Sequence, residues 1–448
     1  MKKIIKPILA VAVLAVSAAI GYESYNRYQN QQLAFANPLL EENINALSDT
    51  NGGSYRYPHL LGKPKSCTLY HYLFLIPIFF ILVSCNETSL DTKCPTINVE
   101  LTDNVEEFGA DTILTTDSAE LIPLQSTDNR PIGNVEIFKS DGERIAIVDD
   151  NYESIYIFSV NGTLVNVIHS VGKANSEYFE IADICLEKDF VYILDYRKRV
   201  VLKYTIRGEF VKSINIEKYW GNQMACKNGL IYLINDYSPT DIGNYEVFVI
   251  DENGNLINKY LPFEFTYMAT PPVSCLQNND EIMIVSQSDN TIYEVKEDKC
   301  SPIVRLDYGN KQMPEKFQKN DLRRLAEEKV LDKYIFGIKR FRFSEKIILV
   351  DFDYDSEEYT LLYNRITGKS TLTKGFIVNS NYRVGLSNYY ISGEYVYEIM
   401  DASTLLFTYD AVFKQKDYLQ DPYKSKLDGI VRTLKDSDNP VIFRYKLK

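Results

Sequence analysis

The segment ERIAIVDDNYESIYIFSVNGTLVNVI, residues 143–168, is the clearest indication of the fold, because the chain repeats its pattern. A similar segment, DFVYILDYRKRVVLKYTIRGEFVKSI, occupies residues 189–214, and a third, GLIYLINDYSPTDIGNYEVFVIDENGNLINKY, occupies residues 229–260. Each contains an apolar strand ending near an acid, a second strand, a turn with glycine and a third strand. Such an internal repeat should be recognised before single elements are assigned.

The turn glycines give the repeat its period, because Gly162, Gly208 and Gly254 are successively 46 residues apart. Acids also recur at the strand ends of the three units: Asp149, Asp195 and Asp236. Units of about 40–50 residues with three or four antiparallel strands are the blades of a β-propeller. A β-sandwich is the competing fold, but it would show turns every ~8–12 residues without this long period.

Three further units follow, at residues 281–306, 345–373 and 388–409, of which the last is the weakest match. Together they predict an all-β, six-bladed β-propeller of four-stranded antiparallel blades over residues 118–448. We expect the last strand, Val441 to Leu447, to help close the ring. Two segments depart from the strand rhythm, and their apolar spacing predicts a capping helix over residues 314–333 and a C-terminal helix over residues 415–436.

The cysteines favour core packing over chemistry. None of the seven lies in a CxxC motif, and Cys185, Cys226 and Cys275 each precede the same strand of three consecutive units. A residue repeated at one blade position is most simply a small buried hydrophobe. If Cys85 is consumed as described below, the odd number left argues against a complete disulfide framework.

Composition limits the partners of this chain of 448 residues. It contains 34 Tyr and 22 Phe, which favours strands, and its formal net charge is -12. Such an acidic body should be repelled by nucleic acid and by anionic lipid headgroups. Membrane association is therefore expected only through an anchor, and no nucleic-acid partner is expected.

Two export signals precede the repeats. Residues 1–21 have a basic start and a short apolar run, as in a secretory signal. Residues 63–85 form a second signal, which ends in the lipobox-like sequence Leu82-Val83-Ser84-Cys85 and predicts cleavage before Cys85 and lipid attachment to its thiol. Residues 86–117 are polar and are predicted to form a tether.

Both signals cannot operate normally in one chain. A fusion or a wrongly assigned start explains them, with the mature protein beginning at Cys85; the alternative is a complete chain in which the second apolar run is a membrane-buried hairpin. Residues 22–62 resemble the secreted bacterial peptides of the NVEALA family, since NINALS, residues 43–48, stands where that family has N-V-E-A-L-A.

A second resemblance covers residues 95–448. The segments AELIPLQSTDNRPIGNVEIFKSDGERIAIVDD, residues 119–150, and VGKANSEYFEIADICLE, residues 171–187, resemble the six-bladed β-propeller lipoproteins of Gram-negative bacteria, relatives of the NHL-repeat propellers. The family turn G-x-G-P-G-E-[FY] keeps Gly172, Glu177 and Tyr178 here, and the family ending keeps residues 438–441, DNPV. The resemblance implies the fold, a lipid anchor and an outer-membrane location facing the periplasm or the cell surface, but little chemistry.

Few residues suggest chemistry, and no cofactor or catalytic residue is expected. His169 lacks a partner at a useful spacing, and Asp351, Asp353 and Asp355 are weak candidates for a cation site that lacks the EF-hand glycine. Lys339, Arg340 and Arg342 form a basic cluster that could face an anionic ligand. Thr112 and Ser118 match a short O-glycosylation pattern.

We therefore expect a monomeric, lipid-anchored binding module for an unknown protein or glycan. The alternative is a propeller enzyme, a hydrolase or lyase acting on glycans or peptides, for which the fold alone gives no warrant.

Overall fold

The computed structural model describes residues 94–448 except 103–104, 127–130, 150–152, 236, 265–274, 287–288, 319–324, 326–327, 331, 380–383, 386–388 and 415–422. The chain divides into two units, Met1–Asp91 and Thr92–Lys448, and the first lies outside the described residues. The predicted signals, the NVEALA-like region and the lipobox therefore lie outside them too.

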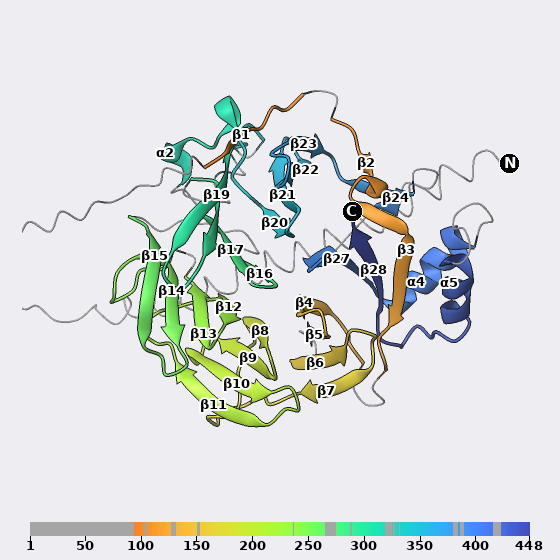
Figure 1. The fold of residues 1–448 in the computed structure, drawn as a ribbon, viewed down its shortest axis with the longest axis horizontal. Helices are drawn as coiled ribbons and strands as arrows, with labels where there is room; N and C mark the ends of the chain where they lie inside the picture. Colours follow the sequence, from red (N-terminus) through yellow and green to blue (C-terminus); the bar gives the residue numbers. More distant parts are fainter. Residues whose placement is uncertain are drawn as a thin grey trace, which may run out of the picture. The chain divides into compact units, whose positions relative to one another are not determined.

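The second unit is a six-bladed β-propeller, as predicted (Figure 1). The first three blades are β4 Val135–Ser140, β5 Arg144–Asp149, β6 Ser154–Ser159 and β7 Leu164–Ile168; β8 Asp183–Glu187, β9 Phe190–Asp195, β10 Val200–Thr205 and β11 Phe210–Asn215; β12 Gln223–Lys227, β13 Leu230–Ile234, β14 Tyr245–Asp251 and β15 Leu256–Pro262. The next two are β16 Cys275–Asn278, β17 Glu281–Ser286, β18 Thr291–Val295 and β19 Cys300–Asp307; β20 Arg340–Phe343, β21 Ile347–Tyr354, β22 Glu357–Asn364 and β23 Ser370–Thr373. The sixth is β26 Tyr389–Ser392, β27 Tyr395–Met400, β28 Val441–Leu447 and β3 Leu114–Pro123.

The hydrophobic core consists of layers between adjacent blades. Between the first two blades, for example, Ile157 of β6 and Ile193 of β9 are fully buried in one cluster. Five further clusters occupy the other five joints of the ring. Because both faces of a blade are covered, its central strands are almost continuously apolar, which is how they read in the sequence.

The glycines of the repeat lie against the preceding blade. Gly254 has a φ of +78°, and a Cβ there would lie 2.8 Å from the carbonyl oxygen of Asn215, at the end of β11. Gly162 has a φ of +87° and approaches Pro123 of the sixth blade in the same way. Both the left-handed backbone and the close approach exclude a side chain. Gly368 of the fifth blade has a φ of +69°, but nothing lies within 4 Å of its missing Cβ.

In the first two blades the acids at the strand ends bind the loops that enter the blade. Both carboxylate oxygens of buried Asp149 accept backbone N–H groups, from Gly133 at 2.6 Å and Asn134 at 3.3 Å. Asp195 likewise accepts the N–H of Phe179 at 2.6 Å. In the third blade Asp236 lies outside the described residues, and Asn235 accepts the N–H of Ser238.

The turn that resembles the family motif is stabilised by hydrogen bonds of the motif residues that this chain keeps. Glu177 folds back to accept the N–H of Ala174 at 2.8 Å. The buried Tyr178 donates its hydroxyl to the carbonyl of Glu153 at 2.8 Å. Lys198 donates to the carbonyls of Ala174 and Glu177. This part of the resemblance therefore reflects loop architecture.

The ring closes with strands from both ends of the propeller. β28 pairs with β27 on one side and with β3 on the other, both antiparallel, which confirms that the last strand takes part in closure. The buried Asn439 accepts the N–H of Ile132 at 2.8 Å and donates to the carbonyl of Gln125 at 2.8 Å. The DNPV segment thus joins the two ends of the propeller by hydrogen bonds, and we call it the clasp.

The described residues before β3 do not form a tether. β1 Thr96–Asn98 pairs in parallel with β19 at the outer edge of the fourth blade. β2 Phe108–Gly109 pairs in parallel with β24 Phe376–Asn379, which also pairs with β25 Val384–Gly385, and the short helix η1 Ala110–Thr112 follows. The tether prediction for residues 86–117 is therefore wrong over these elements, because the outer strands bind this polar segment through its backbone.

The helices depart most from expectation. Over residues 314–333 the structure describes α2 Glu315–Gln318, preceded by η2 Gly309–Lys311, and much of the rest lies outside the described residues. Of the helix predicted over residues 415–436, the structure describes α5 Tyr423–Val431; residues 415–422 lie outside the described residues, and residues 432–436 are not helical. The third strand expected at the end of residues 388–409 is instead α4 Ala402–Thr408, followed by the π-helical turn η3 Tyr409–Phe413. No helix in the described part of the chain combines the length and apolar character of a membrane span.

The described cysteines are free thiols, and Cys185, Cys226 and Cys275 are buried on innermost strands. They lie in the clusters between blades, which confirms their interpretation as core residues. Burial raises the pKa of the Cys226 thiol, which disfavours the reactive thiolate.

Candidate ligand-binding groove

The structure places the predicted modification sites as follows. Leu82, Val83, Ser84 and Cys85 lie outside the described residues. Thr112 is exposed in η1, where its hydroxyl donates to the carbonyl of Gly109 at 2.7 Å. Ser118 lies within β3, and its side chain is outside the described part.

Two clusters of opposite charge, separate in the sequence, meet on the fifth blade. Asp351 of β21 lies 2.8 Å from Arg342 and 3.1 Å from Arg340, both of β20. Lys339 lies 2.9 Å from Asp353 and 2.6 Å from Glu358. The cations and anions thus compensate each other, while Asp355 lies exposed in the following turn.

The pKa shifts follow from this pairing. Burial acts to raise the pKa of Asp351, but the guanidinium groups of Arg342 and Arg340 outweigh it and hold the pKa below its usual value. At Asp353, burial dominates over Lys339 and raises the pKa. Among the described residues, no group of three or more His, Cys, Asp or Glu side chains is arranged to hold a metal ion.

His169 lies 3.1 Å from the hydroxyl of Ser154, a contact within the described residues. Ser154 is fully buried, so its hydroxyl is not presented to solvent. The nearby Asp149 directs its two oxygens to backbone N–H groups, as described above. These contacts connect strand ends and do not assemble a nucleophile, a base and an orienting acid.

The innermost strands bind each other around the ring through polar side chains. Lys139 of β4 lies 2.9 Å from Asp183 of β8, for example, and burial of this lysine is outweighed by that carboxylate, which raises its pKa. Every joint between neighbouring blades has at least one such contact: Lys139–Asp183, Asp183–Met224 N–H, Gln223–Cys275 N–H, Asn278–Phe343 C=O, Arg342–Tyr389 C=O and Ser392–Ser140 C=O. The polar groups here serve chiefly to hold the blades in register.

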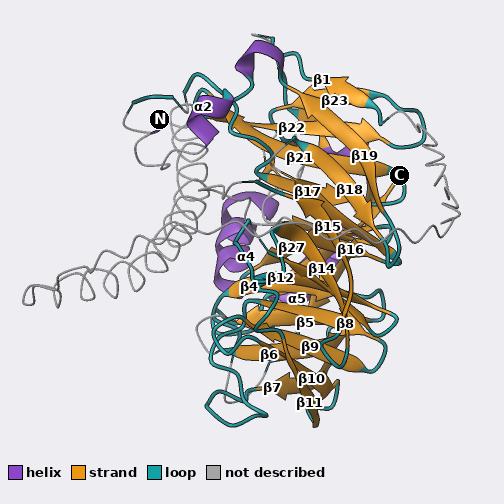
Figure 2. Ribbon diagram, turned by 90° about the vertical axis from the view of Figure 1, so that its left-hand side faces the viewer, coloured by secondary structure: helices purple, strands orange, loops and turns teal. Residues whose placement is uncertain are grey.

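The sixth blade differs from the others by a helical insertion between β27 and β28. It contains α4, η3 and α5. Figure 1 shows α4 and α5 beside β3, at the outside of the ring of blades, and Figure 2 shows the same two helices in purple. Leu405, Val412 and Leu427 anchor it in the cluster between the fifth and sixth blades. Tyr409 donates to Asp428 at 2.7 Å and so ties η3 to α5. A π-helical turn inside a helix is frequent at functional sites.

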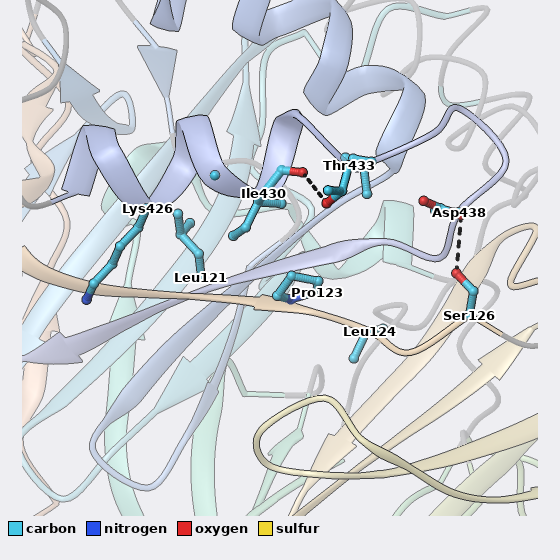
Figure 3. Close-up of a pocket in the computed structure, with 10 residues that line it drawn as sticks. Leu121, Pro123, Leu124, Ser126, Lys426, Ile430, Thr433 and Asp438 are labelled. Atoms are coloured by element: carbon cyan, nitrogen blue, oxygen red, sulfur yellow. Dashed lines mark hydrogen bonds between the residues drawn. The ribbon is translucent and has the colours of Figure 1, made fainter.

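A cavity of about 520 Å³ lies between this insertion and β3 (Figure 3). Its lining combines an apolar centre with polar ends: Leu121, Pro123, Leu124, Ser126, Lys426, Gly429, Ile430, Thr433, Leu434 and Asp438. We call it the insertion groove. Its volume is within the range of about 300–1,000 Å³ that is typical of small-ligand sites.

The two ends of the groove differ in charge. At one end Asp438 accepts the N–H of Lys435 at 2.9 Å and a weaker bond from the Ser126 hydroxyl at 3.4 Å (Figure 3). At the other, Lys426 is exposed on α5 and has no ion pair within the described residues. Such a site can hold an apolar group and orient a polar one on each side.

The groove could not be predicted from the sequence, because it depends on contacts between segments about 300 residues apart. A helix signal was nevertheless present, since Asp401 stands directly before α4, where a helix N-cap is expected.

The fold and the groove define a class: a six-bladed β-propeller with one blade enlarged by a helical insertion. The chain belongs to the family of the domain of unknown function DUF4934, whose sequence profile matches residues 94–446. No curated protein matches the chain.

One solved structure shows the same fold, and a second is similar over most of its length. The "Putative exported protein (BF0058)" of Bacteroides fragilis NCTC 9343 is 18% identical, with a TM-score of 0.61, and the match covers 79% of this chain and 99% of that one. A DUF4221 family member from Bacteroides vulgatus ATCC 8482 is 10% identical, with a TM-score of 0.43 over 75% of this chain and 98% of that one.

Proposed function

We propose that this protein is a lipid-anchored β-propeller of the bacterial outer membrane that binds a protein or glycan at the insertion groove. The observation that carries the proposal is that the groove is built by a helical insertion in one blade of a repeated fold. In repeat architectures such insertions commonly gather on the binding face, while the repeats form the rigid frame.

The proposed lipid anchor and location rest on the sequence before the propeller. The lipobox-like Leu82-Val83-Ser84-Cys85 follows a basic flank and an apolar run, and two acyl chains on Cys85 would provide stable anchoring. A protein of the same fold named as an exported protein supports export of this chain as well. The acidic propeller would then be held at the membrane by the lipid alone.

The anchor is tested on the full chain, produced in a Gram-negative host that processes lipoproteins. We expect metabolic labelling with an alkyne fatty acid to mark the protein, and Cys85→Ser to abolish the label. Mass spectrometry of the mature N-terminus should find a diacylated Cys85. A mature chain that begins near residue 22 with an unmodified Cys85 would contradict the anchor.

Binding is tested by capture of proteins and arrayed glycans from envelope extracts on the immobilised full chain. Thr433→Arg places a long side chain in the groove, and Asp436→Arg introduces the same side chain at an exposed position nearby, outside the lining. We expect a captured ligand that Thr433→Arg loses and Asp436→Arg retains. Capture that is equal for the two variants would place binding elsewhere.

A further inference from the structure

β3 borders the groove with a free strand edge. It is the last strand of its sheet, so its far edge has no strand partner among the described residues. The N–H of Leu124 donates to the carbonyl of Pro440 at 3.1 Å, toward β28. Because backbone groups alternate in an antiparallel pair, the N–H and C=O of Leu121 point away from β28.

Pro123 supports this register. A proline has no N–H, so it fits in a strand only where its nitrogen faces away from the paired neighbour. Pro123 is two residues from Leu121, so its backbone faces the same edge, where its carbonyl oxygen approaches Gly162 of the first blade. The N–H of Gln125 also donates to the carbonyl of Gly162 at 2.9 Å, so the first blade covers the edge at these two residues, and Leu121 lies before the covered part. Leu121 and Pro123 both line the groove.

The same chain shows how other strands of the propeller receive an extended segment. β1 adds to β19 over the pairs Thr96–Arg305 to Asn98–Asp307, and β2 adds to β24. Both additions are parallel, and both bring in short segments remote in sequence from the strands that they join. Strand addition is thus an interaction that this fold already uses.

Gly429 leaves room between α5 and β3. It lies within α5 and lines the groove, and nothing lies within 4 Å of the position where a Cβ would stand. Glycine is unfavourable inside a helix, and no neighbour in the described structure requires its lack of a side chain. An occupant that packs closely against α5 would require it.

We propose that the insertion groove binds an extended segment of a partner protein, which adds a strand to the free edge of β3 at Leu121. One apolar side chain of the segment packs between Leu121, Ile430 and Gly429, and an acidic residue of the segment faces Lys426. An edge strand beside a helix is a recurrent way to combine backbone pairing with a side-chain pocket. The inference rests on the proposed function and specifies the ligand of that site.

The test selects phage-displayed random short peptides on the full chain and measures their affinities by fluorescence polarisation. Leu121→Ala and Leu121→Pro both remove the leucine side chain, but only proline also removes the outward N–H. Because residue 121 donates no backbone hydrogen bond to β28, proline leaves the pairing of β3 with β28 intact. We expect Leu121→Pro to bind the selected peptides about fivefold or more weakly than Leu121→Ala, as for one lost hydrogen bond. Circular dichroism melts establish that both variants are folded.

Two further variants test the side-chain pocket and the charge. Gly429→Ala fills the space beside α5 without endangering the fold, and we expect about tenfold weaker peptide binding from it. Lys426→Glu should disfavour peptides whose apolar residue is flanked by an acid. Equal binding to Leu121→Ala, Leu121→Pro and Gly429→Ala would overturn the inference.

The test separates this inference from the proposed function. If no peptide is selected, but a glycan or folded protein is captured and is lost in Thr433→Arg, the groove is a binding site for a different ligand and strand addition is wrong. If nothing is captured in a way that depends on Thr433, the proposed binding site itself is wrong.

Discussion

The side-chain oxygen of Asn439 accepts the backbone N–H of Ile132 at 2.8 Å, and so joins two segments 307 residues apart. Its nitrogen donates to the carbonyl of Gln125 at 2.8 Å, so one fully buried side chain satisfies two backbone groups. The bond links the start of the first blade to the closing strand of the sixth.

Replacing this residue should weaken the whole ring. We expect Asn439→Ala to lower the free energy of unfolding by about 2–4 kcal/mol, because the Ile132 N–H and the Gln125 C=O lose their partner in a buried place. Urea denaturation measures the change. The exposed Asp436→Ala is the control and should lie within about 0.5 kcal/mol of wild type; an equally small effect of Asn439→Ala would show that closure does not depend on the clasp.

The turn glycines make a matched pair. Gly254→Ala should destabilise the protein by several kcal/mol more than Gly368→Ala, although both have positive φ angles. Each substitution brings backbone strain of about 1–2 kcal/mol, but only at Gly254 would the new Cβ collide with a backbone carbonyl, that of Asn215. Thermal melts of the two variants give the comparison, and equal losses would show that the approach to the preceding blade is unimportant.

The free energy of unfolding should fall in acid because of Glu252. Burial acts to raise the pKa of this carboxyl, but hydrogen bonds from Lys203, Tyr192 and Lys212 outweigh it and lower the pKa from 4.5 to about 2. Because the folded pKa lies below the unfolded one, the stabilisation is complete above about pH 4.5 and disappears as the pH falls toward 2.

Glu252→Gln tests this directly. It should remove up to about 3 kcal/mol at pH 7, where the carboxylate is ionised. Urea unfolding at several values between pH 7 and pH 2.5 should show that the difference between variant and wild type shrinks on acidification. A constant difference over this range would contradict the assigned pKa.

Gly429→Ala is expected to stabilise the free protein. Alanine is favoured over glycine in a helix by about 0.5–1 kcal/mol, and the space for its Cβ is open. Differential scanning calorimetry should show a higher Tm without ligand. A lower Tm would reveal a packing role for this glycine in α5 and remove it as an indicator of ligand space.

Much of the fold was predictable because each blade is a local unit. The hairpins of residues 143–168 and 189–214 have their apolar alternation and turn glycines within one short stretch, so the sequence of a single repeat identifies them. The sixth blade was predicted less well. Its last two strands come from β28 and β3, and an insertion occupies the place where a third strand was expected.

The candidate sites were harder to predict, because side-chain partners depend on register between strands. Lys339, Arg340 and Arg342 suggested an anion site, and Asp351 and Asp353 a cation site, until the pairing of β20 with β21 placed them together. The N-terminal segment suggested a tether because it is polar and lacks periodicity. This segment pairs with β19 and β24, which are remote in sequence, so its own residues do not predict the pairing.

The closure by β3 and β28 also sets an order of events during synthesis. Glu120 of β3 leaves the ribosome 324 residues before its partner Arg444 of β28. Until then β3 lacks its strand partner, and its edge is open to wrong pairing. In the export that we propose, the nascent chain would cross the membrane in this state, and holdase chaperones would affect how much protein reaches its final state.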